Sequence, residues 1–279
     1  MAETTGWMAQ DWPDEPPAAS DLRPEVPHPA RIYNYLLGGK DNFPADRAAA
    51  EQLISLSPGI GAAARSNRTF LRRAVRLAAE QGIGQFLDIG TGIPSEGNTH
   101  QVAQLVDPAA RVVYVDNDPI VLAHARALMA GPGHGATTVL QADLREPEAI
   151  LADPRVRAAL DFDRPVALLL VAVLHFIDEE QDPYRLVATL LAALAPGSLL
   201  ILSHGTGDFD PPARVAAGTQ VYCAATAQVT PRSRAQIERF LTGLELVEPG
   251  LVPAPAWRAE SAEEAAIWAP GYAVVARKP

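Results

Sequence analysis

The sequence predicts an α/β protein with a doubly wound, mostly parallel seven-stranded sheet of the Rossmann-like kind. From Gly82 onward, short apolar segments alternate with segments of helical periodicity, as expected for parallel strands that helices cover on both faces. The last two predicted strands follow one another without an intervening helix and add an antiparallel pair to the sheet. At 279 residues, the chain can form one large domain with an appendage.

Three parts are expected along the chain. Residues 1–27 contain five prolines among acidic and small residues, a composition that predicts a disordered tail. Residues 28–81 predict an N-terminal helical arm or lid, and residues 82–279 predict the main ligand-binding domain.

The elements are expected in the following order. In the arm, apolar periodicity predicts helices over residues 29–37, 44–55 and 66–81. In the main domain, strands are expected at 85–89, 112–116, 138–142, 166–173 and 199–204, with helices at 99–106, 119–129, 147–160 and 183–194. A helix from Thr230 to Gly243 and strands at 244–251 and 272–276 complete the chain.

The loop after the first strand carries two glycines one residue apart, Gly90 and Gly92, directly behind Asp88. In a doubly wound sheet the ligand lies at the carboxyl ends of the strands, and glycine lets it approach the backbone, although an ordinary tight turn would also use these residues. A dinucleotide fingerprint requires glycine where Ser95 stands, and Pro94 lacks the N–H that a pyrophosphate needs. The loop therefore favours an adenosine that carries an amino acid, with Asp88 meeting its ammonium group directly or through water.

Acidic residues also follow the second and third strands. Asp116 ends the second strand, where a carboxylate accepts hydrogen bonds from ribose hydroxyls, and we group Asn117 with it as a ligand contact. Asp118 is expected to cap the next helix. After the third strand, Asp143 could accept from the adenine amino group while the amide of Leu144 donates to the ring, or Asp143 could only cap a turn.

Two histidines follow the fourth and fifth strands. His175 stands where acceptor and cofactor would meet, and a neutral imidazole there could accept a proton. His204 occupies the analogous position after the fifth strand, and a structural role is open for both. We find no metal-ligand spacing and expect no metal site.

Charge and cysteine content exclude several classes of protein. The formal net charge of −10 argues against nucleic-acid binding. The arginines between residues 65 and 76 are interpreted as a solvated helix face, or alternatively as a local basic patch. Cys223 is the single cysteine, and neither a secretory signal nor a membrane helix is recognised, so we expect a cytoplasmic protein.

The sequence resembles a bacterial family of predicted S-adenosylmethionine-dependent methyltransferases, first catalogued as a domain of unknown function. The resemblance rests on the run from Pro29 through Tyr35–Leu36–Leu37–Gly38–Gly39–Lys40–Asp41–Asn42–Phe43 to Asp46, and on Asp88 to Pro94, Gly97 to His100, Val115 to Pro119, Leu244 to Val252 and Trp257–Arg258. It covers nearly everything after the tail. It implies a class I methyltransferase fold, S-adenosylmethionine as cofactor, and cofactor contacts at Asp88, Gly90, Gly92, Asp116 and Asp143, and it names no substrate.

Methyl transfer from a sulfonium requires mainly alignment and exclusion of water. We therefore expect the segment from Tyr33 to Phe43 to act as a lid that moves through Gly38 and Gly39. Lys40 and Asp41 would then contact substrate or cofactor, and Tyr33 and Tyr35 would pack around it. Tyr33 joins His175 and His204 as a candidate catalytic residue, although an arm that only covers the sheet is equally compatible with the sequence.

Two other functions are compatible with the sequence. A nicotinamide-dependent oxidoreductase shares the sheet and the acid after the second strand, and a non-catalytic S-adenosylmethionine-binding regulator shares the whole cofactor site. The acceptor is expected to be a small molecule of unknown identity, and the sequence does not indicate an oligomeric state.

Overall fold

The computed structural model describes residues 23–129 and 136–279. The tail expected over residues 1–27 lies outside the described residues, apart from its last five. Within the described residues, no helix combines the length and apolar character needed to cross a membrane.

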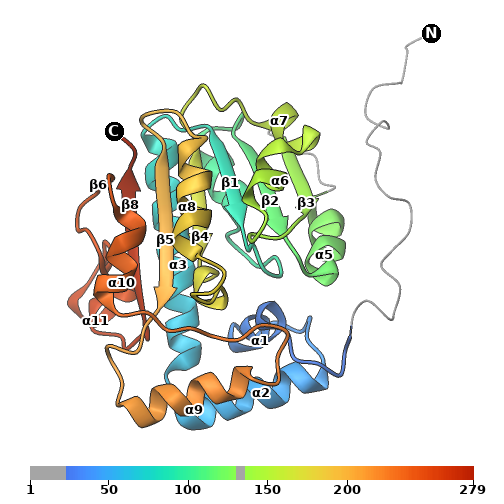
Figure 1. Ribbon diagram of the computed structural model, residues 1–279, viewed down its shortest axis with the longest axis vertical. Helices are drawn as coiled ribbons and strands as arrows, with labels where there is room; N and C mark the ends of the chain where they lie inside the picture. Colours follow the sequence, from blue (N-terminus) through green and yellow to red (C-terminus); the bar gives the residue numbers. More distant parts are fainter. Residues whose placement is uncertain (1–22, 130–135) are drawn as a thin grey trace.

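A mixed sheet forms the centre of the protein, with strand order β3-β2-β1-β4-β5-β8-β6 (Figure 1). The parallel strands are β1 (Gln85–Ile89), β2 (Arg111–Asp116), β3 (Thr137–Gln141), β4 (Ala167–Val171) and β5 (Leu199–Gly205). The last strand, β8 (Gly271–Arg277), is antiparallel to β5. The predicted fold class is confirmed.

The outermost position of the sheet differs in detail from the expected strand over residues 244–251. Two short strands, β6 (Glu245–Leu246) and β7 (Val252–Pro253), pair with different parts of β8. Pro249, which has no N–H to donate, and Gly250, at φ +81°, form a turn between them. The sheet therefore has eight strands in seven positions.

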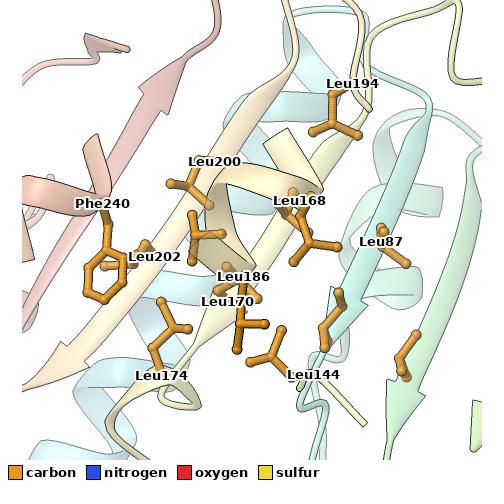
Figure 2. Close-up of a cluster of buried hydrophobic side chains, with 14 of the residues drawn as sticks. Leu87, Leu144, Leu168, Leu170, Leu174, Leu186, Leu194, Leu200, Leu202 and Phe240 are labelled. Carbon is orange, nitrogen blue, oxygen red and sulfur yellow. The ribbon is translucent and has the colours of Figure 1, made fainter. Parts of the chain in front are cut away.

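Helices cover both faces of the sheet. One face carries α3 (Ile60–Glu80), α4 (Thr99–Val106) and α5 (Pro119–Met129), and the other carries α6 (Pro147–Ala152), α7 (Pro154–Ala159), α8 (Pro183–Ala192) and α10 (Arg234–Glu238). Successive residues of a strand serve opposite faces: Leu168 and Leu170 pack toward α8 (Figure 2), whereas Leu169 packs toward α3. This alternation explains why the central strands are apolar throughout.

A third group of helices lies across the carboxyl ends of the parallel strands, and we call it the cover. It consists of α1 (Pro29–Leu36), α2 (Pro44–Leu56) and α9 (Pro212–Tyr222), which lie beside the tip of the β5 arrow in Figure 1. Ile32, Leu36 and Leu53 form its apolar centre, with Tyr222 of α9 packed against them. Helix α9 was not expected from the sequence, because its exposed, alanine-rich segment has little amphipathic pattern.

Several element boundaries also differ from expectation. The helix expected over 147–160 is divided into α6 and α7, because Pro154 cannot continue a helix and instead begins the second one. Helix α3 begins at Ile60, six residues before the expected start at residue 66. The helix expected from Thr230 begins at Arg234 after its N-cap Ser233 and ends in η3 (Arg239–Leu241). Short helices η2 (Leu174–Phe176), η4 (Ala254–Ala256) and α11 (Ala262–Ala265) lie in loops.

Candidate functional site

A cavity of about 550 Å³ lies between the carboxyl ends of the parallel strands and the cover. It has the size of an ordinary small-molecule site, which is roughly 300–1,000 Å³. Loops after β1, β2, β3, β4 and β5 line one side, and residues of α1, α2, α3 and α9 line the other. We call these two sides the strand-end wall and the cover wall.

The glycine loop after β1 forms part of the strand-end wall. Gly90 and Gly92 have φ values of +75° and +68°, a region that other residues rarely adopt. A Cβ at Gly90 would lie 2.4 Å from the Val173 side chain, whereas a Cβ at Gly92 would meet no protein atom within 4 Å. Gly90 therefore permits close packing of two loops, and Gly92 leaves space beside the cavity.

Asp116 joins the loops after β1 and β2. Its carboxylate accepts from the amide of Gly92 at 2.8 Å and from the amide of Asp118 at 2.9 Å. Burial raises the pKa of Asp116 to about 6, against the opposing effect of these hydrogen bonds. Because each carboxylate oxygen has two lone pairs, both can accept a further hydrogen bond from a ligand that enters the cavity.

Two opposite charges line the cavity near the end of β1. Asp88 is buried and accepts from the Thr99 hydroxyl at 2.6 Å. Burial raises its pKa to about 6, and the Thr99 hydrogen bond and the charge of Arg68 oppose that rise. Arg68, on α3, donates through Nη2 to Asn98 Oδ1 at 3.2 Å, while its buried Nε has no partner among the described residues. An orphaned buried donor beside a cavity is explained if a ligand supplies the acceptor.

The residues after β2 and β3 meet on the same wall. Asp143 forms a bidentate pair with Arg145 and accepts from Asn117 Nδ2 at 3.2 Å. Burial raises the pKa of Asp143, but the bonds from Arg145 outweigh it and the net direction is downward. Asp143 also caps its own turn by accepting from the Arg145 amide at 2.9 Å. Leu144 is buried and lines the cavity.

His175 lines the cavity between its two walls, but it is arranged as a hydrogen-bond donor. Its Nδ1 accepts from the Gly205 amide at 3.2 Å, so the neutral ring carries its proton on Nε2. Burial, together with the charge of Arg232, lowers the pKa of His175 to about 4. The proton-accepting role considered from the sequence therefore does not fit this geometry.

His204 is held entirely by protein groups. Its Nδ1 donates to the Gly205 carbonyl at 2.7 Å, and its Nε2 accepts from Arg232 Nη1 at 3.0 Å. Burial holds its pKa well below the ordinary value. This arrangement corresponds to the structural role that the sequence left open.

Arg232 is the centre of the network that holds His204. It is fully buried and donates to the carbonyls of Leu174 and Ile177 at 3.0 and 2.8 Å, and to Glu179 at 2.8 Å. These bonds fix the loop after β4, which carries His175, against the segment before α10. Sequence reasoning missed Arg232, because its partners lie far from it along the chain.

Tyr33, the third candidate catalytic residue, lines the cover wall. Its hydroxyl donates to the Ala64 carbonyl at 3.0 Å and accepts from Asn67 Nδ2 at 3.0 Å. Burial raises its pKa. The hydroxyl therefore positions α1 on α3 and is poorly suited to remove a proton from an acceptor.

Of the segment expected to close over the ligand, Tyr33 and Leu36 line the cavity, but its glycines and the loop after them do not. Tyr35, Gly38, Gly39, Lys40 and Asp41 are not among the lining residues, and Gly38, Lys40 and Asp41 are exposed. Gly38, at φ +84°, ends α1, and a Cβ at Gly39 would overlap the side chain of Asn34. Helix termination and close packing thus account for both glycines without a hinge.

Helices α1 and α2 are attached to the sheet through a buried charge cluster. Arg31 lies 3.5 Å from Asp46 and 3.9 Å from Asp118, and His28 Nδ1 lies 3.0 Å from Asp118. Asp118 also caps α5, as expected, by accepting from the Ile120 amide at 2.9 Å. This cluster connects α1 and α2 to the end of β2, and it had no recognisable signal in the sequence.

The segment that leads into α4 does not form a pyrophosphate-binding site. The helix begins at Thr99, ten residues beyond the end of β1. Its leading amides already have partners: Ser95 donates to Asn98 Oδ1, Asn98 to Gln101 Oε1 and His100 to the Tyr114 hydroxyl, at 3.0, 2.9 and 2.8 Å. Dinucleotide sites require such amides to be free. In the described part of the chain, no group of His, Cys, Asp and Glu side chains is arranged to hold a metal ion.

The strand order, the antiparallel final strands and the acid-lined cavity define the class I methyltransferase fold. The chain belongs to the S-adenosyl methyltransferase family, which matches residues 15–279. The resemblance drawn from the sequence is thereby confirmed. Membership implies the use of S-adenosylmethionine.

Two solved structures are similar over almost the whole chain. A DUF574 family protein from Streptomyces avermitilis MA-4680 is 44% identical, with 92% of this chain and 100% of that chain covered and a TM-score of 0.88. A candidate methyltransferase from Thermobifida fusca YX is 42% identical, with 96% and 99% covered and a TM-score of 0.85. Mitomycin 7-O-methyltransferase MmcR, at 20% identity, 93% and 73% coverage and a TM-score of 0.51, shares the fold. No curated protein matches the sequence.

Proposed function

We propose that the protein binds S-adenosylmethionine against the strand-end wall and transfers its methyl group to a small-molecule acceptor. The pair of opposite charges at the end of β1 carries this proposal. The amino acid group of the cofactor is a zwitterion, so it requires one anion and one cation at the same end of the cavity. Asp88 would bind its ammonium group, and the unpartnered Nε of Arg68 would donate to its carboxylate.

The other residues of the strand-end wall fit the nucleoside. Asp116 would accept from the ribose hydroxyls through the lone pairs that Gly92 and Asp118 leave free. Asn117 and the amide of Leu144 would contact the adenine. Asp143 already accepts two hydrogen bonds at each oxygen, from Arg145 and Asn117, so it would reach the adenine amino group only in exchange for one of them. Gly90 and Gly92 would admit the cofactor close to the backbone. All of these residues were predicted from the sequence as cofactor contacts, although the sequence did not assign Asn117 to the adenine, and Arg68 is added to them.

The chain's own residues would contribute alignment and exclusion of water. When bound, S-adenosylmethionine supplies an electrophilic methyl group. The cover of α1, α2 and α9 closes the cavity on the side opposite the strand ends, which would keep water from the reacting atoms. His175 would donate a hydrogen bond from Nε2, and the hydroxyl of Tyr33 and the ring of His204 would hold the walls in place.

The domain division follows the same logic. We propose that residues 28–81 form an arm whose first two helices cover the cavity and that residues 82–279 form the methyltransferase domain. The charge cluster of His28, Arg31, Asp46 and Asp118 supports a cover that is attached as a unit. Contact of Lys40 or Asp41 with substrate would require their loop to move, and stays a prediction.

Calorimetric titration with S-adenosylhomocysteine, the demethylated cofactor, tests the proposal. We expect saturable binding, and ligand at ~100 times its dissociation constant should stabilise the fold by ~2.7 kcal/mol. NADH is the matched control and should not bind, because the amides of Ser95, Asn98 and His100 beside the start of α4 already have protein partners. Binding of NADH without binding of S-adenosylhomocysteine would favour an oxidoreductase. Tight cofactor binding without transfer of labelled methyl to any acceptor in a broad panel would favour a regulator.

A further inference from the structure

The cover wall is chemically different from the strand-end wall. Aromatic rings from four separate segments line this part of the cavity: Tyr33 of α1 and Tyr222 of α9 on the cover wall itself, with Phe176, from the loop after β4, and Trp268, from the loop before β8, beside them. The rings of Phe176 and Tyr222 lie 5.7 Å apart between centroids and are tilted by 56°. Aromatic walls of this kind favour a flat, apolar partner over a flexible or strongly hydrated one.

Aliphatic side chains complete this surface, and the charges beside α9 are paired with each other. Leu53, Leu56 and Ile60 line the cavity from α2 and the start of α3. Asp210, just before α9, and Arg214, on it, also line the cavity and form an ion pair of 2.9 Å. An ionic ligand beside α9 would have to compete with this pair, so this part of the wall favours an uncharged occupant.

Helix α9 has a glycine, Gly218, where it lines the cavity. Gly218 lies in the interior of Pro212–Tyr222, where glycine destabilises a helix relative to alanine. It lines the cavity, and a Cβ there would meet no protein atom within 4 Å. Protein packing therefore does not require glycine at this position. A broad molecule lying against the helix would require it, because a side chain there would occupy the same space.

One directional polar group faces this surface. His175 lines the cavity with its Nδ1 used by Gly205, and no hydrogen bond among the described residues engages its Nε2. The Nε2–H group is therefore able to donate a hydrogen bond to a ligand. A ligand oxygen beside the cover wall would satisfy it.

We infer that the methyl acceptor is a flat, uncharged aromatic molecule that lies against Gly218 of α9 between the aromatic rings of the cover wall and accepts a hydrogen bond from His175. This inference rests on the proposed function, because it assigns the strand-end wall to the cofactor. It names the class of acceptor that the proposed function leaves open.

Calorimetry with three probes of similar size tests the inference, using the full chain saturated with S-adenosylhomocysteine. The probes are 2-naphthol, which is flat and uncharged at neutral pH, its saturated analogue decahydro-2-naphthol, and the anion 2-naphthalenesulfonate. We expect 2-naphthol to bind at least about tenfold more tightly than either of the others, since the aromatic walls, the neutral surface and the donor each favour it.

Variants locate the binding surface. Gly218→Leu should weaken 2-naphthol binding by at least about tenfold and leave the affinity for S-adenosylhomocysteine unchanged, because the new side chain enters the cover side of the cavity. Ala216→Leu is the matched control: Ala216 is on the same helix, is exposed and does not line the cavity, so both affinities should stay at their wild-type values. Gly218→Ala, a smaller change that favours the helix, replaces Gly218→Leu if the larger side chain prevents folding, and it should weaken 2-naphthol by a smaller factor.

His175→Phe tests the hydrogen bond. It should weaken 2-naphthol and leave naphthalene, which has no oxygen, unaffected. Equal affinities for 2-naphthol and its saturated analogue, or no effect of either substitution at Gly218, would overturn the acceptor class while cofactor binding persists. Failure of the wild-type chain to bind S-adenosylhomocysteine would instead overturn the proposed function.

Discussion

The strand-end wall and the cover wall enclose the same cavity, but the chain specifies them in different ways. Each functional residue of the strand-end wall lies at the end of a buried strand or within the next few residues. Asp88, Asp116 and Asp143 are positioned by β1, β2 and β3, and parallel strands place their carboxyl ends at one edge. The cover wall brings together helices from near the start of the chain and one from the last third.

This difference separates two kinds of information. The contacts proposed for the nucleoside are local, because a strand and the next two residues suffice to place them. The contacts proposed for the acceptor depend on where α9 packs against α2, and residues far apart in sequence decide that. The wall proposed to bind the cofactor can therefore be predicted from one sequence, and the wall proposed to bind the acceptor cannot.

The largest effect is expected at Arg232, because it holds the loop after β4 against the end of β5 on the strand-end wall. Arg232→Met should lower the free energy of unfolding by ~3–5 kcal/mol, since it leaves two buried carbonyls and His204 Nε2 without their donor. Urea denaturation measures this directly.

The matched control is Arg234→Met, which removes an exposed i,i+4 ion pair with Glu238. That pair should contribute less than ~0.5 kcal/mol. If the two substitutions prove equally mild, the buried network around Arg232 is not what fixes the loop after β4.

Arg68 lies on α3 and not at a strand end. In the proposed complex it nevertheless binds the same amino acid group of the ligand as Asp88. Arg68→Gln should weaken binding of S-adenosylhomocysteine by roughly 10- to 100-fold, in line with ~1.5–3 kcal/mol for a hydrogen bond to a charged group. Methylthioadenosine, which lacks the amino acid group, should bind equally to both proteins. Calorimetry with the two ligands separates the effects.

Arg76→Gln serves as the control for Arg68, since Arg76 is exposed on the same helix and does not line the cavity. It should leave both affinities unchanged. Equal weakening of the two ligands by Arg68→Gln would mean that Arg68 acts only by holding the loop at Gly97 and Asn98.

The extent of prediction from sequence follows the same division. The sheet, its antiparallel ending and the residues at three strand ends could be predicted, because periodicity and strand-end position determine them. Arg68 could not be separated from neighbouring arginines: it and Arg72 lie one turn apart on α3, yet Arg72 is exposed and Arg68 has a buried Nε. The way α3 packs against the rest of the protein determines that Arg68, and not Arg72 one turn later, lines the cavity.

The protonation state of His175 could not be predicted from the sequence either. The sequence placed His175 correctly beside the cavity but could not show that the Gly205 amide occupies its Nδ1. That bond depends on the register between the ends of β4 and β5. The position of a side chain can thus be predicted when a single strand determines it. Its chemical role cannot be predicted when that role depends on how two strands are aligned.

The smallest expected effect is a pH dependence that isolates Asp88 from Asp116. Burial raises the pKa of Asp88 to about 6 in the unliganded protein. The ammonium group of the ligand, like an α-amino group of pKa ~8, stays protonated at lower pH, so acid neutralises only the carboxylate. The ionised fraction of Asp88 is nearly complete at pH 7 and falls about tenfold by pH 5. Affinity for S-adenosylhomocysteine, relative to methylthioadenosine, should therefore fall about tenfold between those values.

In the proposed complex Asp116 contacts the ribose, which both ligands share, so its titration cancels in the ratio of the two affinities. Asp88→Asn should make the ratio independent of pH, and a ratio that already shows no pH dependence in the wild-type protein would remove Asp88 from the ammonium contact.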